Sequence, residues 1–244
     1  MIPFLGPADP FPPVEQALDE PDGLLAAGGT LTTRRLVEAY RQGIFPWFNE
    51  GDPVLWWSPD PRTVLVPSRI HVSHSLKKRL KKAAFLITID AAFARVLDGC
   101  AAPRPQDSGT WLTPAMRRAY TALHTAGLAH SVEVWMDGEL AGGIYGVAIG
   151  RMFFGESVFS RRTDASKIAM TRLAVQLDRW RFPLIDCQLE TDHLRSLGAE
   201  SMPRRKFVRA VERLVKQPPP SWQLDEDLRG SAEHAPRTLL RAES

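Results

Sequence analysis

Two polar residues interrupt an otherwise apolar segment in the C-terminal half of the chain. Residues 184–189 read Leu-Ile-Asp-Cys-Gln-Leu, a run typical of a β-strand. Because strand side chains alternate, Asp186 and Gln188 are predicted on one face, roughly 7 Å apart at their Cα atoms for a rise of about 3.3 Å per residue. A carboxylate and an amide on an inner strand are costly unless they are hydrogen-bonded. They form either a catalytic pair or a satisfied structural pair.

A third polar candidate, Glu156, directly follows the sequence Phe-Phe-Gly at residues 153–155. A glycine at a strand end lets a ligand approach the backbone closely. Glu156 is therefore placed to bind an ammonium group or to orient a nucleophilic amine. The alternative is a solvated carboxylate in a turn.

Basic side chains crowd residues 73–82, a segment that predicts a helix: Lys77, Lys78, Arg79, Lys81 and Lys82. Such a helix could neutralise about four or five phosphates of a nucleic acid, and roughly 10²-fold in affinity would then be lost between about 50 and 200 mM salt. A run of charge is more often a solvated face, so both interpretations stay open.

Several aromatic residues could stack on an unpaired base, which contributes about 1–3 kcal/mol per base. They are Tyr40, Trp47, Trp56, Trp57, Trp111 and Tyr120. Large aromatic side chains are more often packed in a core, and we expect most of this set to be packed.

The sequence lacks the common signatures of cofactor and metal chemistry. It contains no GxxxxGK[ST] phosphate loop, no GxGxxG, no HExxH and no GxSxG. The two cysteines, Cys100 and Cys187, have no metal-ligand spacing and are expected to be reduced thiols. We therefore expect no metal and no cofactor, and a substrate that arrives already activated.

Composition is ordinary for a globular protein, with 44% hydrophobic and 24% charged residues. The 31 basic residues exceed the 28 acidic ones by only three, which excludes a histone-like polycation but not a local basic patch. We find neither a signal peptide nor an apolar run of about 18 residues, and expect a cytoplasmic protein with no membrane contact.

Local signals predict the elements that position these residues. A helix starts at Thr32 or Thr33 and ends before Gly43. Strands over residues 131–136 and 140–149 flank Asp137-Gly138, a strong hairpin signal, and residues 151–154 continue as a third antiparallel strand. A helix capped by Asp164 then leads into the strand at 184–189.

This order of elements predicts an α+β fold with a mostly antiparallel mixed sheet. Prolines and aromatic residues dominate the first part of the chain, which indicates a small N-terminal lobe over residues 1–62. Residues 63–216 form the catalytic domain. Residues 217–244 begin near three consecutive prolines and continue with polar residues, and we expect a loosely held tail.

Long, compositionally unusual strings then point to one family. They run in collinear order from about residue 10 to about residue 207: DGLLAAGGTLT (22–32), AYRQGIFPWF (39–48), LWWSPDPR (55–62), GTWLT (109–113), SVEVW (131–135), GGIYGVAIG (142–150), FFGESVFS (153–160), ASKIA (165–169), LIDCQL (184–189) and HLRSLGAESMPR (193–204). Together they closely resemble the bacterial leucyl/phenylalanyl-tRNA–protein transferase family.

The resemblance implies a fold and a reaction. The C-terminal domain is expected to have the fold of the GCN5-related acetyltransferases. The expected substrates are Leu-tRNA or Phe-tRNA and a protein with N-terminal Arg or Lys, and the product N-terminus routes that protein to degradation by the N-end rule. A monomer is the default expectation.

The resemblance also implies roles for individual residues. The 3′ end and side chain of the aminoacyl-tRNA are expected to meet Tyr40, Trp47, Trp111, Tyr120, Ile144 and Phe153. The five basic residues at 77–82 fall on the family's tRNA-contacting helix, although the individual basic positions are not identical. Ile144 stands where the family has methionine, and Leu173 where some relatives have an aromatic residue; both are mild departures.

The polar residues of the family's active site correspond to Glu156, Asp186 and Gln188. We expect Glu156 and Asp186 to hold the acceptor's ammonium group, and the Gln188 carbonyl, polarised by Asp186, to orient the attacking amine. Placement alone can contribute about 7–11 kcal/mol.

Two alternatives are a CoA-dependent acetyltransferase and a tRNA-binding module without chemistry. The first lacks a glycine-containing pyrophosphate loop at residues 159–167, and the grouped polar residues speak against the second.

Overall fold

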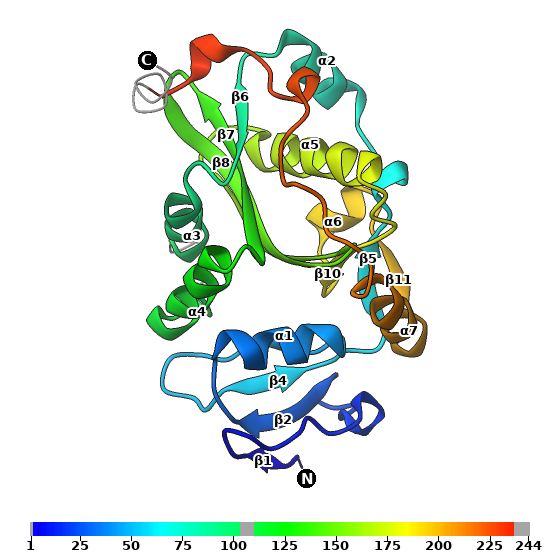
Figure 1. The fold of residues 1–244 in the computed structure, drawn as a ribbon. Helices are drawn as coiled ribbons and strands as arrows, with labels where there is room; N and C mark the ends of the chain where they lie inside the picture. Colours follow the sequence, from blue (N-terminus) through cyan, green and yellow to red (C-terminus); the bar gives the residue numbers. More distant parts are fainter. Residues whose placement is uncertain (1, 103–109, 237–244) are drawn as a thin grey trace.

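The computed structural model describes residues 2–102 and 110–236 (Figure 1). Near the N-terminus, four short strands form a sheet in the order β1-β2-β4-β3. Their bounds are Phe4–Leu5 (β1), Leu24–Gly28 (β2), Phe45–Pro46 (β3) and Leu55–Trp57 (β4). Helix α1, Thr33–Arg41, begins after Thr32, whose side chain accepts a hydrogen bond from the Arg35 N–H. This confirms the predicted helix start.

A larger sheet has seven strands in the order β11-β5-β10-β9-β8-β7-β6. All neighbouring pairs are antiparallel except β9 with β10, which is parallel. The predicted α+β class with a mostly antiparallel mixed sheet is therefore confirmed. The bounds are Arg62–Leu65 (β5), Leu86–Ile89 (β6), Ala129–Met136 (β7), Glu139–Ile149 (β8), Met152–Ser160 (β9), Ile185–Gln188 (β10) and Glu200–Met202 (β11).

Helices cover both faces of the large sheet. A Cβ atom added at Gly142 would lie 2.7 Å from the Ala165 Cβ of α5, and one added at Gly143 would meet Val96 of α3 at 3.2 Å. Since neighbouring strand residues point to opposite faces, α5 and α3 pack on opposite sides. The helices are His74–Lys82 (α2), Phe93–Ala101 (α3), Pro114–Thr125 (α4), Ala165–Arg179 (α5), Asp192–Ser196 (α6) and Arg204–Leu214 (α7).

The two sheets share one hydrophobic core. In Figure 1, α1 lies between the small sheet and the large one. The ring of Tyr40 on α1 packs against Phe154 of β9 with centroids 4.9 Å apart. A single cluster of buried residues extends from Trp56 in the small sheet to Tyr145 in the large one. The division of the chain after residues 62 and 216 stays a prediction.

The turn at Asp137 and Gly138 forms as predicted. Both residues have positive φ, 52° and 79°, which a two-residue hairpin turn of type I′ requires. The third strand is longer than predicted, because β9 continues to Ser160. Glu156 therefore lies within a strand and not in a turn. Asp164 precedes α5, but its side chain makes no capping hydrogen bond and pairs with Arg79 at 3.4 Å.

The described part of the C-terminal tail is packed, contrary to the prediction of a loosely held segment. The indole of Trp222 stacks on His130 with ring centroids 3.7 Å apart, and Leu224 and Leu228 are buried. Ion pairs from Arg179 to Asp225 and Asp227 hold the segment on the domain together with these apolar contacts. Residues 237–244 of this tail lie outside the described residues. Within the described residues, the helices are too short or too polar to cross a membrane.

Replacing Trp222 with alanine is expected to lower the free energy of unfolding by about 2–3 kcal/mol, because the indole packs against His130, Trp180 and Phe153. Urea denaturation of Trp222→Ala measures the loss. Trp222→Phe keeps an aromatic ring and should retain most of the stability. An unchanged midpoint for Trp222→Ala would show that the segment contributes nothing to the fold.

Candidate active site

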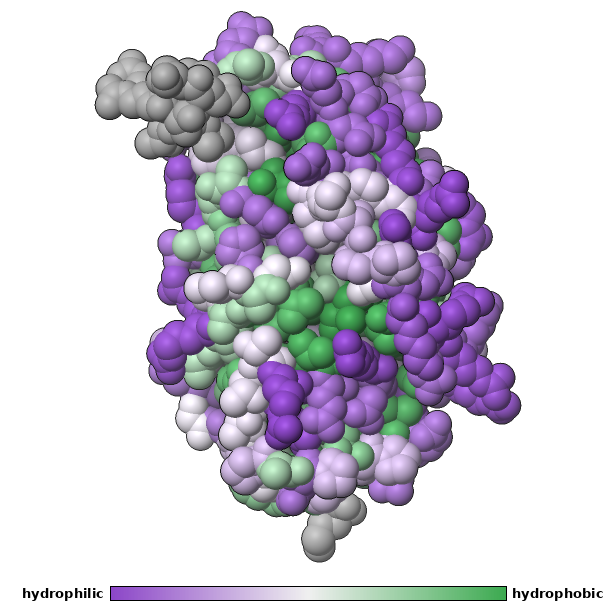
Figure 2. Space-filling view, viewed as in Figure 1, coloured by the Kyte–Doolittle hydropathy of each residue, from purple (hydrophilic) through white to green (hydrophobic). Residues whose placement is uncertain are grey.

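A cavity of about 780 Å³ opens where β9 and β10 separate. These parallel strands pair through Ile185 with Phe153 and Asp186 with Phe154, and the residues that follow on each strand line the cavity. The remaining walls come from β3, the end of α3, α5 and α6, together with Trp111. Figure 2 shows hydrophobic residues gathered in the middle of the face, between α5 and α1, within a hydrophilic surround.

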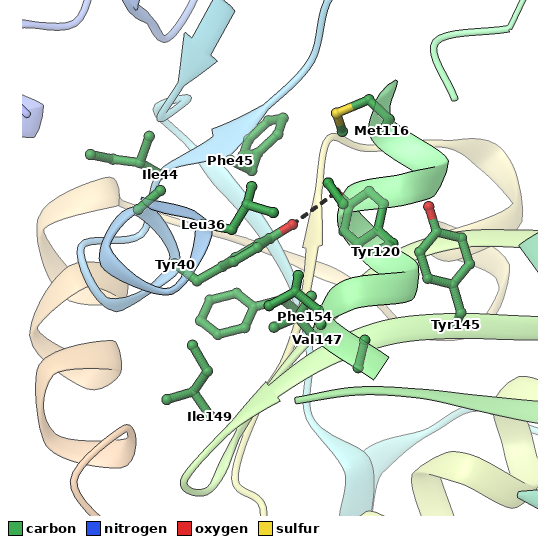
Figure 3. Close-up of a cluster of buried hydrophobic side chains, with 14 of the residues drawn as sticks. Leu36, Tyr40, Ile44, Phe45, Met116, Tyr120, Tyr145, Val147, Ile149 and Phe154 are labelled. Carbon is green, nitrogen blue, oxygen red and sulfur yellow. Dashed lines mark hydrogen bonds between the residues drawn. The ribbon is translucent and has the colours of Figure 1, made fainter. Parts of the chain in front are cut away.

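The carboxylate of Glu156 lies on the cavity wall with three polar neighbours. The hydroxyls of Tyr40 and Tyr120 donate to it at 2.7 and 2.5 Å, and the Gln188 amide donates at 3.3 Å. The two tyrosine hydroxyls also lie 2.9 Å apart and point toward one another in Figure 3. These residues come from α1, α4, β9 and β10, so four separate elements position one carboxylate.

The surroundings of Glu156 change its acidity. Burial raises the pKa of Glu156 to about 7, while the hydrogen bonds from Tyr120 and Tyr40 act in the opposite direction. Burial, and the nearby charge of Glu156, raise the pKa of both tyrosines well above the usual value, so their hydroxyls remain donors. Glu156 can consequently be ionised or protonated near neutral pH.

The carboxylate of Asp186 is paired with a second charged residue of the protein, Arg62. Both carboxylate oxygens accept hydrogen bonds from Arg62, each at 2.7 Å, and both side chains are fully buried. The Arg62 guanidinium lies between the rings of Phe45 and Phe207, 4.7 Å from each centroid, and also donates to the Gly43 carbonyl at 3.2 Å. Arg62 thus neutralises the charge of Asp186, and the role of Asp186 in holding the acceptor's ammonium group stays a prediction.

Hydrogen bonds from the backbone and the side chain of Gln188 hold this residue in place. The register of β10 shifts between Asp186 and Gln188, and Gln188 has a positive φ of 55°. Its N–H donates to Asp186 at 3.0 Å, and its side-chain amide donates to Glu156. Asp186 thus accepts a hydrogen bond from the backbone of Gln188, and polarisation of the Gln188 side-chain carbonyl by Asp186 stays a prediction.

The expected aromatic and apolar residues divide into three groups. Trp47, Trp111 and Ile144 line the cavity, and Trp47 is 43% exposed. Tyr40 and Tyr120 are fully buried behind Glu156. Phe153 does not line the cavity, which corrects that expectation.

Strand alternation explains the misplacement of Phe153. Its side chain points to the α5 face of the sheet, where it packs against Trp222 at 5.9 Å between centroids. The next residue on β9, Phe154, points to the opposite face and packs on Tyr40.

The five basic residues of α2 are exposed on its outer face, and Leu76 is buried beneath the helix. None of the five lines the cavity. Arg79 donates to the Thr163 carbonyl at 2.6 Å and pairs with Asp164, so it is partly committed to the structure. The structure therefore does not bring α2 into the cavity wall.

Arg62 is the site residue that sequence reasoning missed. It ends the string LWWSPDPR, but nothing in its local sequence distinguishes it from a surface arginine. Its partner is 124 positions later in the chain.

Sequence comparison decides the family. Residues 64–212 match the model described as leucyl/phenylalanyl-tRNA protein transferase, and residues 29–60 match the N-terminal domain of the same family. The chain belongs to the leucyl/phenylalanyl-tRNA–protein transferase family. This confirms the family expected from the sequence strings and decides against a CoA-dependent acetyltransferase.

Curated members of the family match nearly the whole chain. The leucyl/phenylalanyl-tRNA–protein transferase of Nitrosomonas europaea is 57% identical over 96% of this chain and 100% of that protein. The protein of the same name from Nitrosospira multiformis is 58% identical over 88% of this chain and 93% of its own length.

Solved structures resemble the chain only distantly. A GCN5-related N-acetyltransferase from Kribbella flavida has a TM-score of 0.35 and 14% identity, over 69% of this chain and 59% of that one. A conserved protein of unknown function from Bacteroides thetaiotaomicron has a TM-score of 0.40 and 10% identity, over 65% and 56%. Likenesses of this size add nothing to the sheet topology described above.

Replacing Arg62 with methionine is expected to lower the free energy of unfolding by about 3–5 kcal/mol, because Asp186 would be left buried without a counter-charge. Urea denaturation measures the loss. The double variant Arg62→Met/Asp186→Leu removes both charges and should recover much of the stability. A single Arg62→Met variant as stable as the parent protein would contradict the assigned pairing.

The raised pKa of Glu156 predicts a pH-dependent stability difference. Because the folded state binds this proton more tightly than the unfolded chain, with a pKa of about 7 against 4.5, ionisation of Glu156 destabilises the fold as pH rises through that window. Glu156→Gln removes this loss. The stability of Glu156→Gln relative to the parent should therefore increase by about 3 kcal/mol between these pH values and level off above them.

Urea denaturation of both proteins at a series of pH values measures this difference. Glu133, whose pKa burial also raises to about 7, is present in both proteins and cancels from it. A difference that stays constant with pH would contradict the assignment.

Proposed function

We propose that this enzyme transfers leucine or phenylalanine from charged tRNA to the N-terminal Arg or Lys of an acceptor protein, acting as a monomer in the cytoplasm. The observation that carries the proposal is the cavity at the separation of β9 and β10, which combines an apolar wall with Glu156 and Gln188. Relatives that share more than half of the sequence are named for transfer from leucyl- and phenylalanyl-tRNA to protein.

The reaction requires correct placement of the amine beside the ester more than further activation of the ester. The α-amine of the acceptor attacks the carbonyl carbon of the aminoacyl ester, a peptide bond forms, and the ester C–O bond breaks. The 3′-oxygen of the tRNA leaves and gains a proton, and the amine loses one. Holding the two reactants in register can contribute about 7–11 kcal/mol to such a step.

The cavity supports binding of the aminoacyl end. Ile144 and Met170 provide an apolar surface on which Leu or Phe gains burial energy, whereas a charged side chain would be desolvated without compensation. Trp47 and Trp111 lie on the same cavity wall and can stack on the terminal adenine.

Glu156 and Gln188 support binding of the acceptor amine. The Gln188 amide nitrogen donates to Glu156, which leaves the Gln188 carbonyl oxygen to accept a hydrogen bond from the amine. In its ionised form, Glu156 attracts the ammonium group. Asp186 contributes by fixing the backbone of Gln188, with Arg62 as its counter-charge.

The exposed lysines of α2 are proposed to contact the tRNA backbone, with Arg79 at the edge of that surface. Lys77, Lys78, Lys81 and Lys82 make no ion pair with any residue in the described ranges 2–102 and 110–236, so their charge is available to phosphate.

Radiolabelled Leu-tRNA incubated with the enzyme and a protein beginning with Arg should give labelled protein, and the same protein beginning with Ala should remain unlabelled. Label reaches protein only when the cavity holds both the charged tRNA end and the acceptor amine, so omission of either substrate abolishes labelling. Absence of label on both proteins, with charged tRNA intact and bound, would contradict the proposed transfer.

A further inference from the structure

Helix α7 has one buried face and one free face. Phe207, Val211 and Leu214 repeat at i, i+4 and i+7 and are buried against the rest of the protein. At 3.6 residues per turn, the opposite side of the helix carries a continuous row of basic side chains within an arc of about 100°. The row, called here the α7 stripe, consists of Arg205, Lys206, Arg209 and Arg213 on the helix and of Lys216 just after its end.

The charge of the α7 stripe is not compensated. All five side chains are exposed, and none forms an ion pair or hydrogen bond with a residue of the described chain. Arg204, at the start of the same helix, is by contrast bonded to the Ser58 carbonyl at 2.6 Å and lies near Asp60. Glu212 is the single acidic residue of the helix.

Self-repulsion makes this arrangement costly in the free protein. Arg205, Arg209 and Arg213 are spaced four residues apart, and like charges at this spacing destabilise a helix by about 0.2–0.5 kcal/mol per pair. An anionic partner would remove that cost. The row is about 16 Å long at 1.5 Å per residue, and arginine's planar fork matches phosphate oxygens.

The inner face of α7 is directed toward the cavity, and the α7 stripe lies on the outer face of the same helix. The ring of Phe207, on the inner side of α7, contacts the Arg62 guanidinium, whose other face contacts Phe45 on the cavity wall. The side chains of Phe207, Arg62 and Phe45 thus connect the inner face of α7 with the cavity wall. In Figure 1, α7 lies beside α1 and β11, and the corresponding edge of Figure 2 is hydrophilic.

We infer that the α7 stripe binds the phosphate backbone of the aminoacyl-tRNA near its 3′ end, separately from α2. This inference rests on the proposed function, because it assumes that a charged tRNA places its terminal adenosine in the cavity.

The test removes three charges from the stripe and compares two donors. Arg205→Gln/Arg209→Gln/Arg213→Gln should raise KM for Leu-tRNA roughly tenfold or more, and the slope of log affinity against log salt should become shallower by about 2–3. The KM for an Arg-started acceptor should not change. Transfer from 3′-leucyl-adenosine, which lacks the tRNA body, should remain at the parental rate.

Two matched variants control for charge and for helix stability. Arg118→Gln/Arg181→Gln/Arg229→Gln removes the same charge from scattered exposed positions and should leave KM for Leu-tRNA unchanged. Arg205→Lys/Arg209→Lys/Arg213→Lys keeps the charge of the stripe and should retain the parental salt slope, because that slope depends on the number of phosphates neutralised.

Three results would overturn the inference: an unchanged KM and salt slope for Leu-tRNA, an increase confined to the KM for the acceptor, or an equal loss with 3′-leucyl-adenosine. An increase confined to the acceptor would assign the stripe to an acidic protein surface. If the parent protein transfers from neither donor, the proposed function fails. Fluorescence anisotropy of labelled Leu-tRNA with parent and variant then decides the binding role of the stripe independently.

Discussion

The ion pair between Arg62 and Asp186 is the constraint on which the site depends. Two charges of opposite sign, both withdrawn from water, face each other through two hydrogen bonds of 2.7 Å. A buried pair adds little net stability relative to apolar residues, but it tolerates only a narrow geometry. Arg62 begins β5 and bonds to Gly43 after α1, while Asp186 is on β10. The pair therefore fixes the small sheet, the large sheet and the cavity relative to one another.

The positions of Gln188 and Glu156 depend on this ion pair. Asp186 holds the N–H of Gln188 in a left-handed backbone conformation, and Gln188 then reaches Glu156. Glu156 in turn accepts from tyrosines on two helices. A change that moves Arg62 would also move Asp186, Gln188 and Glu156, because hydrogen bonds link these residues in series. The rigidity suits a reaction that depends on placing an amine beside an ester.

Local chemistry explains what the sequence could predict. The turn at Asp137 and Gly138 and the cap at Thr32 depend on residues within four positions of one another, so their outcome can be read from the sequence. The site residues Glu156, Asp186 and Gln188 could also be named, because charged and amide groups in apolar strands are unusual.

Long-range packing explains what could not be predicted. No local pattern shows that Asp186 is neutralised by Arg62, 124 positions away, or that Phe153 points away from the cavity while Phe154 packs on Tyr40. The packing of the tail depends on Trp222 meeting His130. The family resemblance supplied roles for residues but not their contacts, and the expected place of Phe153 in the cavity required correction for that reason.

The strand order has a consequence for synthesis on the ribosome. Strand β5 pairs only with β10 and β11, whose residues follow it by more than 100 positions. During translation β5 therefore has neither of its neighbours, and β9 has one free edge, until residues 185–202 have left the exit tunnel. Contacts between distant segments form slowly. The cavity exists only after β10 has inserted between β9 and β5, so a growing chain of this enzyme acquires its active site as one of the last steps of folding.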